Sequence, residues 1–324
     1  MHPKYWDQRF RLFSRFDGPP HNLHSAAEPP LQAPCQLDAE SWYSLTPESV
    51  AAHVCRKSAL FLLAHAKRQR GKAMVNHASS PSSSPASGNA PFFIDCFSGC
   101  GGTLIPLARH VKSGQVWAVD LDPEKHRMAA HNAAVYSAGG SIKYVTDDVF
   151  NCLRQLPSLY LSEDTEKSPQ KLSTESSPDL VMLSPPWGGP GYTQSAQFDI
   201  ETMLPSGGGK EMIQLALSRC DHVVSVLPRN CSKTQLREAV VEAYQNLRLE
   251  KCESAPALDE DITPETYPYH IEDIYLYSKH KLTVLYAGPA FANLSKGAKK
   301  RTGTKNAVEA TVEKNVSHIR FEEN

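Results

Sequence analysis

Short apolar runs alternate with amphipathic stretches from residue 92 onward. Five short runs, most of them continuously apolar, are typical of strands buried on both faces of a parallel sheet, and they lie at residues 92–94, 116–119, 142–145, 180–183 and 223–227. Stretches with helical spacing fall between them, at residues 104–111, 124–137 and 210–218. Two more runs complete seven strands, the second as an antiparallel edge, at residues 247–251 and 282–286. The pattern predicts a doubly wound, Rossmann-like α/β sheet.

The first 75 residues have a different pattern and predict a helical extension in front of the sheet. Residues 3–17 interleave aromatic and basic side chains, which fits an amphipathic helix packed on a core. Thr46 is a good N-cap, and Pro47 suits the first helical position. A long helix is therefore expected to run from there to about Arg70.

Four polar or low-complexity segments separate or follow these parts. Each has too few apolar side chains to form a core of its own. We expect a disordered linker, two insertions and a polar tail, at residues 76–91, 157–178, 253–280 and 295–324 respectively. The sheet domain then occupies residues 92–294.

The composition is that of an ordinary globular protein. Of 324 residues, 40% are hydrophobic and 21% are charged, which is enough to build a full core. No apolar run approaches the roughly 20 residues that span a bilayer. The first residues lack the apolar segment of a secretory signal, so none is expected.

Cysteine usage and net charge narrow the chemistry further. The eight cysteines are scattered without the spacing of a zinc site. We therefore expect reduced thiols in a nuclear or cytosolic protein and no bound metal. The net charge of −1 argues against bulk electrostatic binding to long nucleic acid, but it permits a local basic groove for one short polyanion.

A glycine-rich turn, DCFSGCGG, joins the first predicted strand to a helix at residues 95–102. Such a turn brings backbone amides close to a ligand. Its spacing is not the G-x-G-x-x-G of dinucleotide enzymes, and Asp95 precedes the glycines Gly99 and Gly101. This order suits a methionine-like amino group better than a pyrophosphate.

Two further carboxylates follow the next strands of the predicted sheet. Asp120 ends the second strand, where a carboxylate can accept from both ribose hydroxyls. Asp148 follows the third strand, where it can meet an adenine amine. The alternative is that these acids only cap strand ends and helices. Three acids in succession at the carboxyl edge of one sheet favour a cofactor site.

The fourth predicted strand runs directly into Ser184-Pro185-Pro186-Trp187. The two prolines make the backbone rigid, and the aromatic residue offers a planar face. The loop resembles the Asn/Asp/Ser-Pro-Pro-aromatic motif of amino-methyltransferases, which methylate the exocyclic nitrogen of a base. A purely structural turn is the alternative interpretation.

Several other motifs occur in the order found in trimethylguanosine synthases, and the chain resembles that family over almost its whole length apart from the linker, insertions and tail. The motifs are KYWDQRFRLFSRFD, DCFSGCGG, VDLDP, HNAAVY, SPPWGGPGY, FDIETM and LPRN. The resemblance implies a seven-strand methyltransferase that uses S-adenosylmethionine. It also implies methylation of N2 in 7-methylguanosine RNA caps, giving 2,2,7-trimethylguanosine on small nuclear and nucleolar RNAs.

The resemblance also implies roles for single residues. Phe13 and Thr46 would close over the S-adenosylmethionine, which the turn glycines and the three acids bind. The catalytic loop supplies Ser184, Pro185 and Trp187, with Trp187 stacked on the cationic 7-methylguanine. The expected base and triphosphate contacts are Ser184, Asn132, Lys4, Tyr192 and Arg229. No strong base is required, because orientation and proximity can supply most of the acceleration.

Three other functions explain the sequence less completely. An adenine-N6 or cytosine-N4 methyltransferase shares the catalytic loop but does not explain the N-terminal motif. A non-catalytic cap-binding scaffold does not explain the three cofactor acids. A nucleotide-dependent dehydrogenase has the wrong glycine spacing. The family resemblance further implies a nuclear location, in the nucleolus or Cajal-body-like sites with possible cytoplasmic presence, and ribonucleoprotein partners.

Overall fold

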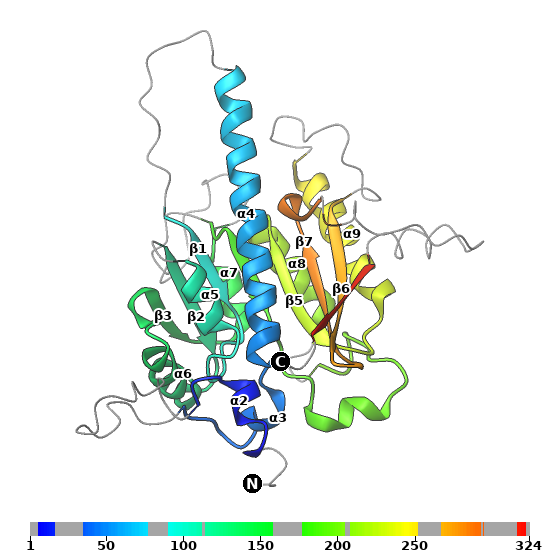
Figure 1. Cartoon of the computed structure of the whole chain (residues 1–324). Coiled ribbons are helices and arrows are strands. Elements are labelled where there is room, and N and C mark those ends of the chain that lie inside the picture. Colours follow the sequence, from blue (N-terminus) through cyan, green and yellow to red (C-terminus); the bar gives the residue numbers. More distant parts are fainter. Residues whose placement is uncertain are drawn as a thin grey trace.

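The computed structural model describes the core of the chain and part of its N-terminal extension (Figure 1). The described residues are 6–16, 35–76, 90–111, 114–157, 177–204, 208–251, 267–292, 294 and 316–321. The predicted linker and the insertion at 157–178 therefore lie almost entirely outside them. Within this part of the chain, no helix is both long and apolar enough to cross a membrane.

One sheet forms the centre of the structure, with the strand order β3-β2-β1-β4-β5-β7-β6-β8. The first five strands are parallel to one another, and β7 runs antiparallel to both of its neighbours. Their bounds are Phe92–Asp95 (β1), Gln115–Asp120 (β2), Ile142–Thr146 (β3), Leu180–Leu183 (β4), Val223–Pro228 (β5), Tyr269–Leu276 (β6), Lys279–Ala287 (β7) and Val316–Phe321 (β8). The predicted doubly wound sheet is confirmed; six of its eight strands were predicted, and β6 and β8 were not.

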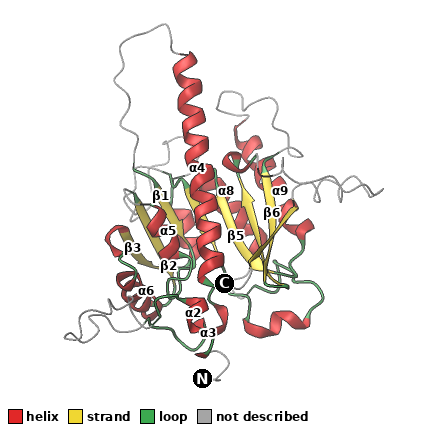
Figure 2. Cartoon of the chain, in the orientation of Figure 1, coloured by secondary structure: helices red, strands yellow, loops and turns green. Residues whose placement is uncertain are grey.

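Helices cover both faces of the sheet (Figure 2). On one face pack α7 (Val149–Gln155), α8 (Gly209–Arg219) and α9 (Lys233–Lys251). On the other pack α4 (Glu48–Asn76), α5 (Leu104–His110) and α6 (Pro123–Val135). Before α4, the described residues include two short helices, α2 (Arg9–Leu12) and α3 (Ser41–Ser44). Three 3-10 turns complete the set: η1 (Gly139–Ser141), η2 (Gly189–Gln194) and η3 (Pro289–Phe291).

The continuous apolar runs are explained by this double coverage. In β2, Trp117 and Val119 pack into the core shared with α7, α8 and α9. Val116 and Ala118 of the same strand pack into the opposite core, with α5 and α6. Because successive side chains of a strand point to opposite faces, most positions of a doubly covered strand are apolar.

Two strand predictions at the C-terminal side of the sheet were wrong. Residues 247–251 end helix α9, and Leu247 is buried on the apolar side of that helix. The strand predicted at 282–286 exists as β7, but it lies between β5 and β6 and not at an edge.

Two segments that were predicted to be irregular contain strands. Residues 269–276, assigned to an insertion, form β6, and residues 316–321 of the expected polar tail form β8 beside it. The strand β6 was missed because His270, Glu272 and Asp273 interrupt its apolar pattern. All three are buried, and the partners that make this possible come from distant parts of the chain.

Within residues 6–16 of the N-terminal extension, Trp6 and Arg9–Leu12 are helical. Leu12, Phe13 and Phe16 are buried against the sheet domain. The long helix α4 begins at Glu48, close to the predicted start, and continues to Asn76. The extension is therefore part of the core and not only a cover for it.

Candidate active site

A cavity of about 600 Å³ opens at the carboxyl ends of the central parallel strands. Its walls come from the turn after β1, the ends of β2 and β3, the loop after β4, and residues 40–46 of the extension. The sheet order reverses between β1 and β4, which is where open α/β sheets bind ligands. The cavity gathers most of the predicted site residues: Thr46, Gly99, Asp120, Asp148, Ser184, Pro185, Trp187 and Tyr192.

The glycine turn is shaped by backbone conformations that favour glycine. Gly99 and Gly101 have φ angles of 48° and 100°, in the region that side chains disfavour. A Cβ at Gly102 would lie 2.8 Å from the side chain of Leu45. The turn is therefore packed directly beneath the extension, while Gly99 faces open space.

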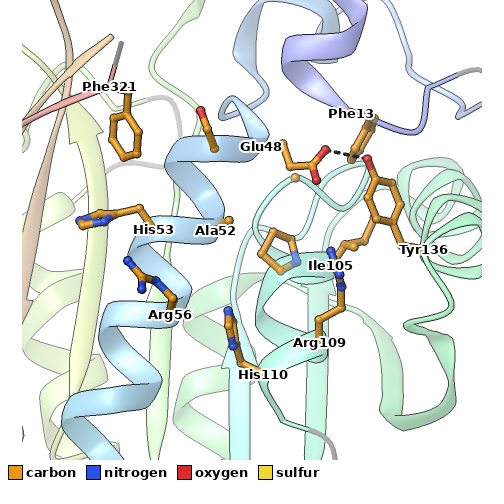
Figure 3. Close-up of a pocket in the computed structure, with 13 residues that line it drawn as sticks. Phe13, Glu48, Ala52, His53, Arg56, Ile105, Arg109, His110, Tyr136 and Phe321 are labelled. Carbon is orange, nitrogen blue, oxygen red and sulfur yellow. Dashed lines mark hydrogen bonds between the residues drawn. The ribbon is translucent and has the colours of Figure 1, made fainter. Parts of the chain in front are cut away.

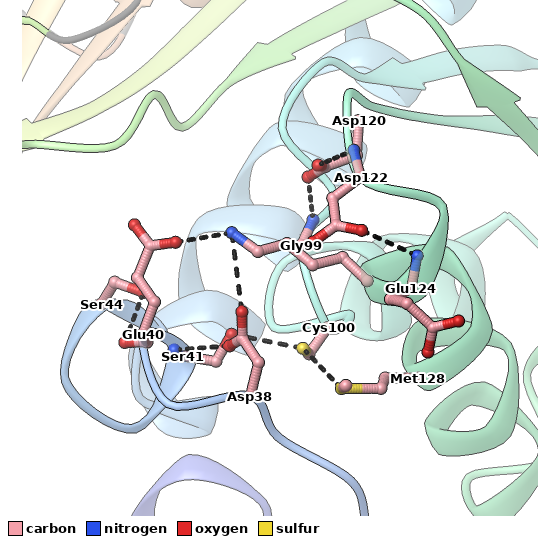
Figure 4. A network of polar contacts seen from close by, with 11 residues as sticks. Asp38, Glu40, Ser41, Ser44, Gly99, Cys100, Asp120, Asp122, Glu124 and Met128 are labelled. Atoms are coloured by element: carbon pink, nitrogen blue, oxygen red, sulfur yellow. Dashed lines mark hydrogen bonds and ion pairs between the residues drawn. The ribbon is translucent and has the colours of Figure 1, made fainter.

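Asp120 ties the turn to the second strand. Its Oδ2 accepts from the amide of Gly99 at 2.9 Å, and its Oδ1 accepts from the amide of Asp122 at 3.0 Å (Figure 4). Each carboxylate oxygen can accept a second hydrogen bond. Asp120 thus holds the turn in place and still presents a carboxylate to the cavity.

Asp148 combines the two roles that the sequence left open. It is the N-cap of α7, where its Oδ1 accepts from the amides of Phe150 and Asn151 at 2.9 and 3.3 Å. It also lines the cavity, together with Asp147. Asp148 therefore caps the helix with its Oδ1, and this role does not exclude a contact between its carboxylate and a ligand in the cavity.

Asp95 does not line the cavity. It is fully buried behind the cavity wall, where Thr103 donates to its Oδ2 at 2.6 Å and the amide of Phe97 donates to its Oδ1 at 3.3 Å. Burial raises the pKa of Asp95 to about 6, against the lowering effect of these two hydrogen bonds. The structure places Asp95 as a support for the turn rather than in the predicted contact with the cofactor.

Lys125 is a cavity residue that the sequence analysis missed. Its Nζ donates to Glu40 at 2.7 Å and lies 3.9 Å from Asp38 (Figure 4). Burial opposes its charge, but the pKa of Lys125 is raised by Glu40 and by the more distant Asp120 and Asp38. A lysine in the first turn of a helix opposes the helix dipole. This unfavourable position in the sequence could have indicated that Lys125 pairs with an acidic residue outside its own helix.

The catalytic loop is held by neighbours on both sides. Ser184 donates from Oγ to the carbonyl of Phe97 at 3.3 Å. The rings of Trp187 and Tyr192 pack at 81° with centroids 5.4 Å apart. Asn230 donates from Nδ2 to the carbonyl of Tyr192 at 3.2 Å. These contacts fix the plane of the indole ring at the wall of the cavity.

Comparison with known proteins decides the family. Residues 90–281 match the family model described as RNA cap guanine-N2 methyltransferase, which is more than half of the chain. The chain belongs to this family. Methylation of guanine N2 in RNA caps is therefore its activity, and the family and fold imply S-adenosylmethionine as the methyl donor.

Two curated relatives support this assignment, and both are named trimethylguanosine synthase. The protein from Schizosaccharomyces pombe is 29% identical over 72% of this chain and 73% of its own length. The protein from Saccharomyces cerevisiae is 30% identical over 73% of this chain, but the match spans only 57% of that protein. A solved structure described as human methyltransferase 10 domain containing protein matches 78% of this chain and 89% of its own, with 11% identity and a TM-score of 0.41.

Phe13 lies outside the cavity of this cap guanine-N2 methyltransferase. It lines a second cavity of about 540 Å³ between α4 and α5, with Glu48 and Tyr136 (Figure 3). Its ring packs on that of Tyr136, with centroids 5.9 Å apart. The predicted closure of Phe13 over the cofactor is not the arrangement seen here.

Asn132 is also placed away from the base site. It is fully buried, donates from Nδ2 to the carbonyls of Gln36 and Cys100, both at 2.8 Å, and accepts from the amide of Gln36 at 2.7 Å. It therefore clamps the extension to the glycine turn. Its predicted contact with the base edge is not supported by this position.

The remaining predicted residues divide into three cases. Gly101 shapes the turn through its amide, which donates to the carbonyl of Ser98 at 2.9 Å, but it does not line the cavity. Arg229 follows β5 at the same edge of the sheet and is exposed. Lys4 lies outside the described residues. Within the described part of the chain, no group of three His, Cys, Asp or Glu residues could hold a metal ion.

Proposed function

We propose that this methyltransferase acts on 7-methylguanosine caps and carries N2 methylation through to 2,2,7-trimethylguanosine. The observation that carries the proposal is the presence of Trp187 and Ser184 in one cavity with Asp120 and the glycine turn. One end of the cavity thus offers a stacking face and a hydrogen-bond acceptor for a base. The other end offers amides and carboxylates for the methyl donor.

Ser184 is oriented to accept from an exocyclic amine. Its hydroxyl proton is used in the bond to the carbonyl of Phe97, so the lone pairs of its Oγ remain for a donor in the cavity. Guanine N2 is such a donor. In this role Ser184 holds the amine in line and does not need to remove its proton, which can leave to water after transfer.

Trp187 supplies selectivity for the methylated base. Methylation at N7 makes the guanine ring cationic, and indole is the best aromatic partner for a cation, worth about 1–2 kcal/mol when the pair is desolvated. The perpendicular contact with Tyr192 keeps the indole plane fixed, so little ordering is needed when the base arrives.

The opposite end of the cavity fits S-adenosylmethionine. Ser98 lines the cavity, and its buried hydroxyl has no protein partner among the described residues, as expected of a group that awaits a ligand. Asp120 would hold the ribose, while Gly99 allows close approach of the backbone. When bound, the cofactor supplies the methyl group on its sulfonium.

The extension would exclude water from the transfer. Residues 40–46 form one wall of the cavity, and Lys125 joins them to α6 through Glu40. The substrates we propose are small nuclear and nucleolar RNAs with their ribonucleoprotein proteins, in the nucleus. The family resemblance supports this part of the proposal, and localisation of the tagged protein would test it.

Labelled S-adenosylmethionine with either 7-methyl-GTP or GTP tests the proposal directly. We expect methyl transfer to 7-methyl-GTP and little or none to GTP, because only 7-methyl-GTP has a cationic base. Mass spectrometry of the product distinguishes one added methyl group from two. Equal rates with the two nucleotides would refute the proposed role of Trp187.

A further inference from the structure

Four basic residues from three separate elements surround one corner of the sheet beside the catalytic loop. Arg11 belongs to α2, Arg229 follows β5, and Lys279 and Lys281 begin β7. All four are exposed. We call them the basic patch.

The strand register brings these residues together. Pro228 and Leu282 are partners in the antiparallel ladder of β5 and β7, so the residues that follow and precede them, Arg229 and Lys281, are neighbours. Lys279 begins β7 immediately after the turn from β6. Helix α2 and this turn lie at the same lower side of the sheet in Figure 1.

Arg11 is fixed over the turn by an aromatic contact. Its guanidinium carbon lies 5.2 Å from the ring centroid of Tyr277, which is half-buried and has a left-handed φ of 58°. Next to it, Tyr275 and His280 are stacked with centroids 4.9 Å apart and planes at 19°. Basic and aromatic side chains therefore alternate over the turn, which is typical of surfaces that bind single-stranded nucleic acid.

The basic patch holds several positive charges close together. In the described part of the chain, Arg229, Lys279 and Lys281 make no ion pair with a carboxylate. Although Lys281 is exposed to solvent, desolvation by the surrounding protein atoms lowers its pKa, and the positive charges of Lys279, Arg11 and Arg229 lower it further. Like charges held together in this way favour a bound polyanion, although the whole chain has a net charge of only −1.

The patch is continuous with the cavity. Asn230, next to Arg229, donates from Nδ2 to the carbonyls of Tyr192 and Ser195 at 3.2 and 2.8 Å. Tyr192 in turn packs on Trp187. A chain of phosphates that leaves a base stacked on Trp187 and passes Arg229 would next reach Lys281, Lys279 and Arg11.

We propose that the basic patch binds the phosphate backbone of the first nucleotides after the cap triphosphate, so that the enzyme recognises capped RNA and not only the cap. This rests on the proposed function, because it takes the cap to lie on Trp187. The occupant is an RNA strand, which matches the patch in charge and in the half-buried rings of Tyr275 and Tyr277 beside it. The patch would then make the affinity for capped RNA higher than the affinity for 7-methyl-GTP.

The test compares dissociation constants for 7-methyl-GTP and for a capped single-stranded RNA of about ten nucleotides, a typical length for such a site. The variants are Lys281→Glu and Lys279→Glu, with Lys67→Glu as the matched control. Lys67 is exposed on α4, far from the catalytic edge. Thermal melts check that each variant is folded. If one of the two patch variants does not fold, the other still tests the proposal.

We expect the wild type and Lys67→Glu to bind capped RNA about 10-fold more tightly than 7-methyl-GTP, and either patch variant to lose most of that preference. The logarithm of affinity should also fall more steeply with the logarithm of salt for capped RNA, by about 0.7 per additional phosphate contact. Equal affinities for the two ligands in the wild type, or an unchanged preference in both patch variants, would overturn the proposal. The latter result is also the one expected if the patch serves an acidic protein.

Methyl transfer is measured in parallel, so the two proposals fail in different ways. A wild type that prefers capped RNA but methylates neither ligand would refute the proposed function and support the patch. A wild type that methylates 7-methyl-GTP but binds both ligands equally would refute only the proposed role of the basic patch.

Discussion

Thr103 donates a hydrogen bond of 2.6 Å from Oγ1 to Oδ2 of the buried Asp95. The pair lies directly behind the glycine turn and joins the end of β1 to the start of α5. Burial raises the pKa of this carboxyl group from 3.8 to about 6. A buried acid with a raised pKa binds its proton more tightly in the folded state than in the unfolded state, and this determines the sign of its effect on stability.

We predict that Asp95 makes the folded protein lose stability as the pH rises from about 4 to about 6. The full effect is on the order of 3 kcal/mol, since each pKa unit is worth about 1.4 kcal/mol. Asp95→Asn removes this titration. In thermal melts without cofactor, the melting temperature of Asp95→Asn relative to the wild type should increase over that pH range. A difference that does not change with pH would contradict the prediction.

The two ends of the active-site cavity should respond separately to substitution. We predict that Trp187→Ala weakens binding of 7-methyl-GTP on the order of 10-fold through loss of the cation–π contact and leaves S-adenosylmethionine binding almost unchanged. Asp120→Ala should do the reverse, because Asp120 supports the turn at Gly99. Calorimetry with each ligand alone is the measurement, and Trp187→Phe, which keeps an aromatic face, is the control. Normal binding of both ligands by Trp187→Ala would show that the stacking face lies elsewhere.

Glu48 should control how firmly the N-terminal segment is attached. Its Oε2 accepts from the amide of Ser14 at 2.5 Å and from the hydroxyl of Tyr136 at 2.7 Å, and its Oε1 accepts from the hydroxyl of Ser14. Hydrogen bonds to a charged group contribute about 1.5–3 kcal/mol each. We predict that Glu48→Ala exposes the segment to trypsin at Arg11 and Arg15 several-fold faster than in the wild type.

The matched control for this prediction is Glu124→Ala. Glu124 makes an exposed ion pair with Arg127, and such surface pairs contribute at most about 1 kcal/mol. Trypsin should cleave the Glu124→Ala variant at the same rate as the wild type. Equal rates for Glu48→Ala and Glu124→Ala would mean that the buried Phe13 and Phe16 hold the segment without help from Glu48.

Glu272 is the buried centre that joins α4 to β6. It contacts His53 at 3.0 Å and Lys57 at 2.7 Å. Burial opposes its charge, but the hydrogen bond with His53 and the hydrogen bond and charge of Lys57 outweigh burial and bring the pKa of Glu272 to about 2. Because this folded-state pKa is depressed, the stabilisation is complete above about pH 4.5 and is lost as the pH falls towards 2.

We predict that Glu272→Ala destabilises the protein by about 3 kcal/mol at neutral pH, because it leaves Lys57 without its buried partner. The double variant Glu272→Leu with Lys57→Met should recover much of that loss, since it removes both charges. Denaturant unfolding of the variants, singly and together, measures the coupling. Additive losses would show that the pair does not act as a unit.

Some tertiary roles could be inferred only partly from the sequence. Asp148 was placed correctly at the cavity, and its capping bonds were open as an alternative. Lys125 was missed, and the hydrogen bonds of Asn132 to the extension were not foreseen, because the partners Glu40 and Gln36 lie 85 and 96 residues away. Nothing in a local pattern shows which distant segment a polar side chain will meet.

The sequence by itself determined the parallel half of the sheet and the position of the site. Strands buried on both faces are mostly apolar, so β1, β2, β4 and β5 can be recognised from the pattern of the sequence, and the motif residues follow directly at their carboxyl ends. Only the tertiary structure decided that β6 and β8 join the sheet and that the antiparallel strand β7 lies between β5 and β6. Glu272 and Asp273 make β6 look like a polar insertion until His53, Lys57 and Lys233 are brought to them. A buried charge is stable only beside its partner, and that partner is assigned by the fold.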